Sequence, residues 1–401
     1  MKILQLCHKP PFPAVDGGTI AMHNIAHGLI GLGDQVKVIA MATHKHPVIE
    51  SDLFDQYREQ TQFESVFVDT SISKWGAIKA LISGKSYHIS RFNFPQFAKK
   101  LTQTLKEDSF DVIQMESIYL TPYIPIIRAN SKAKIVVRLH NIEHQIWERM
   151  IKNERNFLKK IALSLTTRLL KKYELSILNQ VDGFMAISEV DYQYFCTIYP
   201  SVSGITIPFG VDLDQYRYAP LEIDTPKKNL QLFHIGSMNW APNIEGIEWF
   251  LDRVWPVLLT HFPELEFYIA GRDIPEYFNQ YKIPHFNVDG EVPDAQEYML
   301  SKDIMIVPLL SGSGVRIKII EGMALGKVII STSIGAEGLD VVDGEDLFIA
   351  DTPEQYIEAI KQCMSSLEKM KNMAENARKY VESHHHDVTI AHEIIKFYNS
   401  L

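Results

Sequence analysis

The chain has 401 residues, of which 46% are hydrophobic and 22% charged, and its formal net charge is −9. This length exceeds one typical hydrophobic core and fits two domains of about 200 residues each, and the composition is that of a globular protein rather than a disordered one. An acidic chain lacks the basic excess that supplies most of the affinity of nucleic-acid-binding proteins, so we expect no nucleic-acid partner.

Strand-like and helix-like segments alternate along the first half, which is typical of parallel sheets covered by helices. The expected strands are 2–6, 36–42, 66–69, 112–115, 135–139, 183–187 and 204–207. The expected helices are 19–32, 95–106, a long stretch that ends near 179, and 190–198. The turn-rich, proline-containing segment from 208 to about 229 is the expected linker between two domains.

The second half begins the alternation again. Its expected strands are 230–235, 266–270, 286–288, 304–310, 328–331 and 347–349, with helices between them and three more helices at the end of the chain. Two successive alternations of similar length predict an α/β protein with two doubly wound, Rossmann-like domains. In such domains ligands bind at the carboxyl ends of the strands.

The segment 307–331, VPLLSGSGVRIKIIEGMALGKVIIS, is the most informative part of the sequence. An apolar strand leads into a loop of small residues and then into a helix that opens near Val315. Small residues let the backbone approach a ligand, and a helix N-terminus presents N–H groups to an anion. Arg316 and Lys318 add two cations where the helix dipole prefers acids, so an anionic ligand such as a diphosphate is expected. An ordinary strand–loop–helix unit without a ligand is the alternative.

This segment resembles the nucleotide-sugar-dependent, retaining glycosyltransferases of the GT-B type, the group called glycosyl transferases group 1. Their helix carries two glutamates separated by seven residues; Glu321, followed by Gly322, Met323 and Ala324, matches the second, whereas Ser313 occupies the position of the first. In the family the first glutamate contacts hydroxyls of the transferred sugar, so this departure bears on which sugar is carried and on the level of activity. The variant GSGVRIK resembles a branch of active members.

The resemblance implies a GT-B architecture, with two Rossmann-like domains that face each other across a cleft. We place the N-terminal, acceptor-side domain at 1–208 and the nucleotide-sugar-binding domain at 209–386. In the resembled fold the last helix crosses back onto the first domain, and 387–401 supplies such a helix. Ile390, Ile394 and Phe397 are expected to pack there.

Two motifs of the first half resemble family sites. Gly17 and Gly18 open a helix after the first strand, where the family has a Gly-Gly loop that meets the acceptor and the donor phosphate. His140, after the strand 135–139, matches the histidine that the family places near the transferred sugar. A tight turn for the glycines and a structural role for the histidine are the alternatives. No GxGxxG motif follows the first strand, which argues against a nicotinamide dehydrogenase.

In the second half, two charges that the family uses are missing. In the family, an arginine and a lysine at these positions hold the donor diphosphate. Here Ser237, after Gly236, occupies the position of the arginine, and Glu245 occupies the position of the lysine. Arg316 and Lys318 are expected to supply this pair of charges from the opposite side of the same cleft.

Other segments complete the expected donor site. The turn around Arg272 resembles a family turn, and the segment with Glu291 and Val292 matches one whose backbone meets the nucleobase. The expected catalytic residues are His140, Arg316 and Lys318, and Gly17 and Gly18 bind phosphate. The other expected donor-binding residues are Gly236, Ser237, Arg272, Glu291, Val292, Ser313, Gly314, Val315 and Glu321, the last on the ribose.

The sequence has no HExxH motif, no D-x-D pair after a strand and no Walker motif, so we expect neither a metal nor a cofactor. Helix N-termini and basic side chains can neutralise a leaving nucleoside diphosphate. We expect a glycosyltransferase that moves a sugar, with retention of configuration, to a lipid-linked or envelope polysaccharide precursor. A GT-B sugar-nucleotide epimerase and a catalytically silent binding subunit are the alternatives.

The three cysteines, Cys7, Cys196 and Cys363, lie far apart, which fits a reducing cytosol, and the sequence has no apolar run of about 18 residues. We therefore expect a cytoplasmic protein, either soluble or peripheral at the inner face of the cytoplasmic membrane. The segment 149–172 carries eight cations against the single acid Glu154 and predicts a basic amphipathic helix. Its apolar residues face either the protein core or an anionic membrane.

Overall fold

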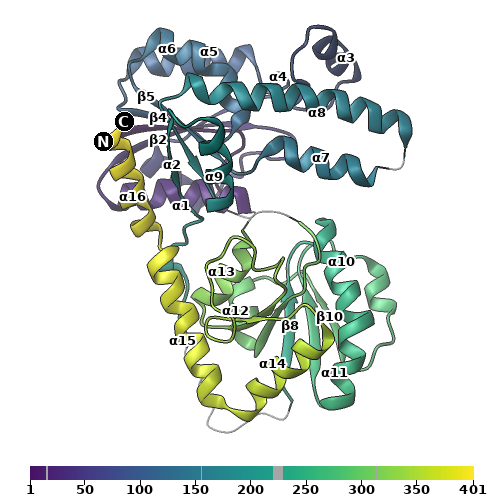
Figure 1. Cartoon of the computed structure of the whole chain (residues 1–401). Coiled ribbons are helices and arrows are strands. Elements are labelled where there is room, and N and C mark those ends of the chain that lie inside the picture. The colour runs from purple at the N-terminus through teal and green to yellow at the C-terminus, as the bar shows by residue number, and fades with distance from the viewer. Residues whose placement is uncertain (15–16, 155, 220–228, 313–314) are drawn as a thin grey trace. The chain divides into compact units, whose positions relative to one another are not determined.

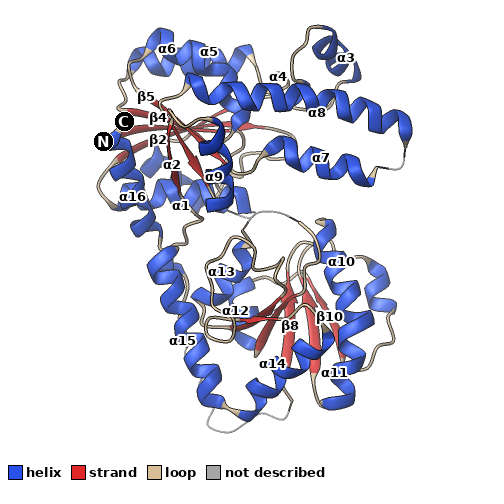
Figure 2. Ribbon diagram, viewed as in Figure 1, coloured by secondary structure: helices blue, strands red, loops and turns tan. Residues whose placement is uncertain are grey.

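The computed structural model describes residues 1–14, 17–154, 156–219, 229–312 and 315–401. Its contacts divide the chain into two compact units (Figures 1 and 2). The N-terminal unit comprises Met1–Gly210 and Asp387–Leu401, and the C-terminal unit comprises Val211–His386. Within the described ranges, no helix has the length and apolar character that crossing a membrane requires.

The N-terminal unit is built on a seven-stranded parallel sheet in the order β3-β2-β1-β4-β5-β6-β7. Its strands are β1 (Lys2–Cys7), β2 (Gln35–Ala42), β3 (Glu64–Phe67), β4 (Val112–Met115), β5 (Lys134–Leu139), β6 (Gly183–Ala186) and β7 (Ser203–Thr206). The central strands are mostly apolar because helices cover both faces of the sheet. The strands β1, β4 and β5 each contain one buried polar residue: Gln5, Gln114 and Arg138, respectively. In register, Leu6 pairs with Ile39 on one side and with Met115 on the other.

Ten α-helices of the N-terminal unit are described. They are α1 (Gly17–Gly31), α2 (Asp52–Thr61), α3 (Lys74–Ile82), α4 (Tyr87–Ser90), α5 (Pro95–Glu107), α6 (Ile124–Asn130), α7 (Glu143–Asn153), α8 (Phe157–Ile177), α9 (Glu189–Ile198) and α16 (Asp387–Ser400). The helical stretch expected to end near 179 is therefore two helices, and Asn156 caps the second by accepting a hydrogen bond from Lys159 N.

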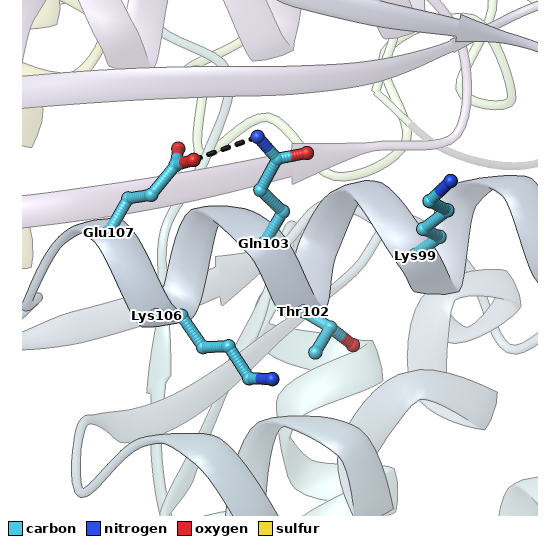
Figure 3. A pocket seen from close by; sticks show the side chains of 5 residues that line it. All are labelled: Lys99, Thr102, Gln103, Lys106 and Glu107. Carbon is cyan, nitrogen blue, oxygen red and sulfur yellow. Dashed lines mark hydrogen bonds between the residues drawn. The ribbon is translucent and has the colours of Figure 1, made fainter.

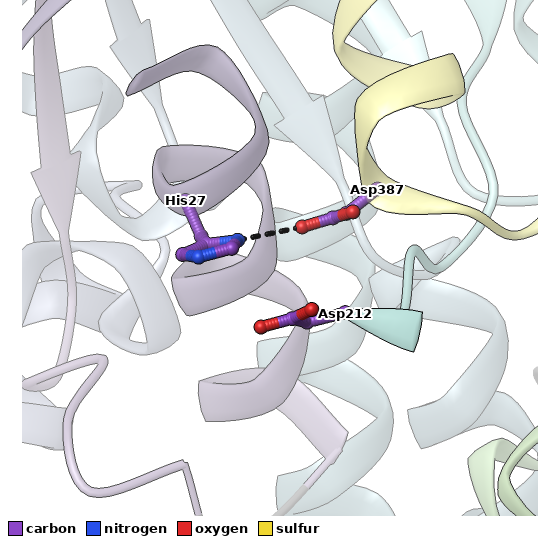
Figure 4. Close-up of side chains that lie close together, drawn as sticks. All are labelled: His27, Asp212 and Asp387. Atoms are coloured by element: carbon purple, nitrogen blue, oxygen red, sulfur yellow. Dashed lines mark hydrogen bonds and ion pairs between the residues drawn. The ribbon is translucent and has the colours of Figure 1, made fainter. Parts of the chain in front are cut away.

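The C-terminal helix α16 packs against α1 within the N-terminal unit. Ile390, Ile394 and Phe397 are buried in one apolar cluster with residues of β1 and β2. Gly28 allows the close approach of α1, because a Cβ at this position would lie 2.6 Å from the carbonyl oxygen of Asp387. The side chain of Asp387 also contacts His27 of α1, with 2.7 Å between Oδ2 and Nδ1 (Figure 4).

The C-terminal unit has a six-stranded parallel sheet in the order β10-β9-β8-β11-β12-β13. Its strands are β8 (Gln231–Ile235), β9 (Glu266–Ala270), β10 (Phe286–Gly290), β11 (Ile304–Val307), β12 (Val328–Ser331) and β13 (Phe348–Ile349). Its described helices include α10 (Ala241–Trp249), a π-helical turn (Phe250–Val254), α11 (Trp255–His261), α12 (Ala295–Ser301), α13 (Ile317–Ala324), α14 (Pro353–Ser365) and α15 (Leu367–His384).

Around the small-residue loop, the elements are shorter than the sequence indicates. The strand expected at 304–310 ends at Val307, and the helix expected to open near Val315 begins at Ile317. Arg316 is extended, with φ −90° and ψ 94°, and is the N-cap residue of α13. Only Lys318 of the two cations therefore lies within the first helical turn.

Candidate functional site

At one end of the C-terminal sheet, three loops that follow strands approach each other through backbone atoms. Gly236, after β8, donates its N–H to Ala270 O at 3.0 Å, and Gly271, after β9, donates to Gly290 O at 2.8 Å. Gly271 has a φ of +137°, and a Cβ there would lie 1.9 Å from Gly236 O. Only glycine fits this position, and the backbone at the carboxyl ends of the strands is fixed as a result.

Lys318 lies at the same end of the sheet. Its Nζ donates to Asn243 Oδ1 at 2.9 Å and lies 3.3 Å from His234 Nε2. Since Nδ1 of His234 is 2.8 Å from Ile306 O, we assign the ring proton to Nδ1, which leaves Nε2 as an acceptor for Lys318. A Cβ on Gly236 would come within 2.5 Å of Lys318 Nζ. Lys318 is thus held over the backbone that follows β8.

In the electrostatics of Lys318, burial and the charge of Arg316 outweigh the attraction of the Glu321 carboxylate. Burial, reinforced by the charge of Arg316, lowers the pKa of Lys318 to about 7. Burial and then the charge of Lys318 hold the pKa of His234 well below its ordinary value, so this imidazole is neutral. The described first turn of α13, from Ile317, contains no acid. An anion bound here would restore the positive charge of Lys318.

Arg316 lies over an aromatic ring. Its guanidinium carbon lies 5.3 Å from the centre of the Trp240 ring, and the side chain is buried. Burial lowers the pKa of Arg316 from its ordinary value. Gly312, with φ +116°, leaves room for this pair, because a Cβ there would lie 3.1 Å both from Arg316 Nη2 and from the indole. A guanidinium over an indole is a favourable cation–π arrangement that orients the arginine.

Glu321, one turn further along α13, accepts a hydrogen bond at 2.8 Å from the hydroxyl of Tyr216. Burial raises the pKa of Glu321, and the bond from Tyr216 opposes this effect. Ser237 Oγ is buried, and no residue that the structure describes gives it a hydrogen-bond partner. The side-chain amide of Asn243 binds the backbone of the same serine, because its Nδ2 donates a hydrogen bond to Ser237 O at 2.8 Å.

The structure therefore brings together Gly236, Ser237, Arg316 and Lys318, which the sequence indicated. Four contributors were missed: Tyr216, His234, Trp240 and Asn243. Trp240 and Asn243 belong to the stretch SMNWAPN directly after β8, and its position after a strand is the signal that could have indicated them.

The other expected donor-binding residues are less closely tied to this cluster. Arg272 accepts a backbone hydrogen bond from Met238 N at 2.8 Å. Val315 is buried, whereas Glu291 is exposed and Val292 half-buried after β10. Two further expected residues, Ser313 and Gly314, lie outside the residues that the structure describes.

In the N-terminal unit, His140 follows β5 and is part of a buried polar network. Its Nε2 lies 3.4 Å from Glu116 Oε2, and Arg138 Nη1 lies 3.6 Å from the same oxygen. Gln5 Nε2 donates to Glu116 Oε1 at 2.7 Å. Burial raises the pKa of Glu116, but the contacts with His140 and Arg138 outweigh it and leave that pKa below its ordinary value. Burial also lowers the pKa of His140.

Gly17 and Gly18 begin α1 of the N-terminal unit. A surface hollow lies elsewhere on this unit, along α5, and Figure 3 shows the side chains that line it: Lys99, Thr102, Gln103, Lys106 and Glu107. Gln103 donates to Glu107 at 2.7 Å. All five belong to one helix, so no groups from different elements converge there, and the two strand-end clusters are the stronger candidates.

Comparison with known proteins adds two family matches. Residues 229–366 match the model of the family "Glycosyl transferases group 1". Residues 15–215 match the model of "Glycosyltransferase Family 4". The two matches cover most of the C-terminal and N-terminal units, respectively.

Individual relatives are distant. An uncharacterized 44.6 kDa protein in the cps region of Klebsiella pneumoniae is 23% identical over 98% of this chain and 99% of its own length. The phosphatidyl-myo-inositol mannosyltransferase of Mycolicibacterium smegmatis is 23% identical over 64% of this chain and 62% of its own. HepE of Anabaena, solved in complex with UDP-glucose, is 16% identical with a TM-score of 0.64 and full coverage of both chains. The predicted fold class, two Rossmann-like domains of the GT-B type, is confirmed.

Proposed function

The chain belongs to Glycosyltransferase Family 4, and we propose that it transfers a sugar from a nucleoside-diphosphate sugar to a lipid-linked or envelope polysaccharide precursor. One observation carries the donor assignment. Arg316 caps the start of α13 and Lys318 lies in its first turn, next to the glycine backbone that follows β8, and no acid lies in the described first turn of that helix. Two cations at the N-terminus of a helix fit a diphosphate.

We assign the donor contacts as follows. Arg316 and Lys318 neutralise the diphosphate, with Gly17 and Gly18 contributing backbone N–H groups. Glu321 binds the ribose hydroxyls through its carboxylate oxygens as hydrogen-bond acceptors. The remaining assignments are Gly236, Ser237, Arg272, Glu291, Val292, Ser313, Gly314 and Val315 around the donor, with Val292 offering its backbone to the base.

In the proposed reaction the acceptor hydroxyl oxygen forms a bond to the anomeric carbon while the bond from that carbon to the phosphate oxygen breaks. Attack from the face that the phosphate leaves retains the configuration, and the departing phosphate takes the hydroxyl proton. Arg316 and Lys318 stabilise the negative charge that develops on the leaving diphosphate, so the scheme requires neither a metal nor a side-chain nucleophile. His140 lies beside the transferred sugar in this scheme.

Three of the compared proteins support the donor and acceptor classes. HepE was solved with UDP-glucose, and a uridine diphosphate sugar is the donor that we test first. One relative is encoded in a cps region and another is a phosphatidyl-myo-inositol mannosyltransferase, which favours an envelope polysaccharide or a lipid acceptor. We place the enzyme in the cytoplasm, peripheral to the inner face of the membrane.

The test is a panel of nucleoside-diphosphate sugars. A bound donor raises the melting temperature by mass action, and its slow hydrolysis or transfer releases the nucleoside diphosphate. Stabilisation by one donor together with this release supports the proposal. Release of a free, altered sugar nucleotide assigns the chain to the epimerases instead, and the absence of stabilisation by every donor contradicts the proposal.

A further inference from the structure

The helix α3 presents an apolar stripe to solvent. Trp75, Ile78 and Ile82 are spaced three and four residues apart, so they lie on one face of the helix. Trp75 is 81% exposed and Ile82 is 83% exposed, and Ile78 is exposed as well. The sequence of α3 contains no acidic residue, and the exposed Lys79 lies next to the stripe. Three large apolar side chains on one solvated face mark an interaction surface.

A second stripe runs along α8. Leu158, Ile161, Leu165, Arg168 and Lys172 follow each other at spacings of three and four residues, and all five are exposed. Leu158 is 77% exposed and Leu165 is 45% exposed. The buried residues of α8 lie on another face: Thr167, Leu170, Glu174 and Ile177. Leu170 and Ile177 thus form the core face of α8, whereas Leu158, Ile161 and Leu165 face solvent.

Both stripes belong to one packed group of helices. The short helix α4 contacts both α3 and α8, and α7 packs along α8 (Figure 1). Tyr87 of α4 accepts a hydrogen bond at 2.6 Å from Ser73 N, at the start of α3. The ring of His88, also on α4, lies 4.3 Å from the ring of Trp147 on α7. These contacts fix α3 to the helices that carry the second stripe.

The charge around the stripes selects the partner. Among the described side chains of α3, α7 and α8, the exposed cations are Lys79, Arg149, Lys152, Lys159, Arg168 and Lys172, of which Lys159 forms an ion pair with Glu154. They gather on a chain with a net charge of −9, so they concentrate positive charge on one part of an acidic protein. A second copy of this chain, docked by the same faces, would bring like charges together, whereas an anionic bilayer supplies the opposite charge and an apolar interior.

We propose that α3 and the exposed stripe of α8 from Leu158 to Lys172 bind the surface of an anionic bilayer, with Trp75, Ile78 and Ile82 inserted among the lipids. This inference rests on the proposed function, since a lipid-linked acceptor lies at a membrane. Its test requires no sugar transfer. Loss of membrane binding would therefore leave the glycosyltransferase assignment untouched, and an inactive donor site would leave membrane binding untouched.

The charge contribution is tested by sedimentation of the full chain with vesicles of phosphatidylcholine, with and without phosphatidylglycerol. We expect binding only to the anionic vesicles and release near 1 M salt, where the Debye length shrinks to about 3 Å. Arg168→Gln with Lys172→Gln should weaken binding roughly thirtyfold, the equivalent of about 2 kcal/mol for two charges. Lys379→Gln with Lys396→Gln removes two exposed cations elsewhere and should change binding little.

The apolar contribution is tested with Trp75→Ser and Ile82→Ser together, which should weaken binding to anionic vesicles by about tenfold or more. The matched control is Val190→Ser with Val342→Ser, since both valines are exposed and lie on other elements. Insertion of the wild-type protein should shift tryptophan emission to shorter wavelength. The variant Trp75→Phe should still bind but lose most of that shift.

Three results would overturn the proposal. The first is equal binding of the wild type to neutral and anionic vesicles. The second is unchanged binding to anionic vesicles in the Arg168→Gln/Lys172→Gln variant and in the Trp75→Ser/Ile82→Ser variant. The third is concentration-dependent self-association that the same substitutions abolish, without vesicle binding, because it would make these stripes an interface between copies. Each variant should keep the melting temperature and the UDP affinity of the wild type, which shows that the fold and the donor site remain intact.

Discussion

Lys318 provides a quantitative prediction, because its charge depends on whether an anion is bound. Burial and Arg316 lower its pKa to about 7, so at pH 8 only about one-tenth of the free protein carries a proton on Nζ. A bound diphosphate stabilises the charged form and raises this pKa toward its ordinary value. Binding at pH 8 should therefore take up about 0.9 proton per UDP through this residue.

The direction of the pH dependence follows from this uptake. Between pH 7 and the higher pKa of the complex, the complex holds more protons than the free protein, so the affinity for UDP falls as the pH rises, by about tenfold per pH unit at most. Below pH 7 Lys318 is charged both in the free protein and in the complex, so the affinity for UDP no longer changes with pH through this residue.

Isothermal titration at pH 8 in buffers with different ionisation enthalpies measures the proton uptake directly. Lys318→Met should abolish the dependence on the buffer and weaken UDP binding by about 1.5 to 3 kcal/mol at pH 6.5, the scale of a charge-assisted hydrogen bond. Lys302→Met is the control, since this half-buried lysine of the same unit packs on Tyr268 instead. Proton uptake that is absent in the wild type, or unchanged in Lys318→Met, would refute the reasoning.

Two further predictions concern the same unit. Glu321→Ala should lose donor affinity while the protein stays folded, and Tyr216→Phe, which removes only the hydrogen bond to Glu321, should lose less; an unfolded Glu321→Ala variant would make this residue structural. Gly271→Ala should lower the free energy of unfolding by about 3 kcal/mol or more, because its Cβ would lie 1.9 Å from a carbonyl oxygen. Gly344→Ala, with φ +77° but no atom within 4 Å, should cost only about 1 kcal/mol, and equal costs by calorimetry would contradict this account.

The strands were predictable because a buried parallel strand is a short apolar run. The segment 328–331 is found within its expected bounds, and 2–6 is longer by one residue. The helix α3 was missed because it is only nine residues long, shorter than the window of about 11 to 18 residues over which apolar periodicity indicates a helix. The break between α7 and α8 depends on the Asn156 cap, a local hydrogen bond that apolar periodicity does not reveal.

The candidate site was predictable only in part. Arg316 and Lys318 were recognisable because two cations near a helix start oppose the helix dipole. Their partners were not, because Asn243 and His234 lie 75 and 84 residues from Lys318 in sequence and meet it only through sheet topology. The contact of Tyr216 with Glu321 spans 105 residues for the same reason.

We propose above all that Arg316 and Lys318 hold the donor diphosphate. The most direct test is the affinity for UDP of the wild type and of Arg316→Ala, measured by titration at neutral pH. We predict that the substitution weakens binding by about 1.5 to 3 kcal/mol, or roughly 10- to 150-fold, and removes most transfer activity. An unchanged affinity for UDP in a folded Arg316→Ala variant would contradict the account.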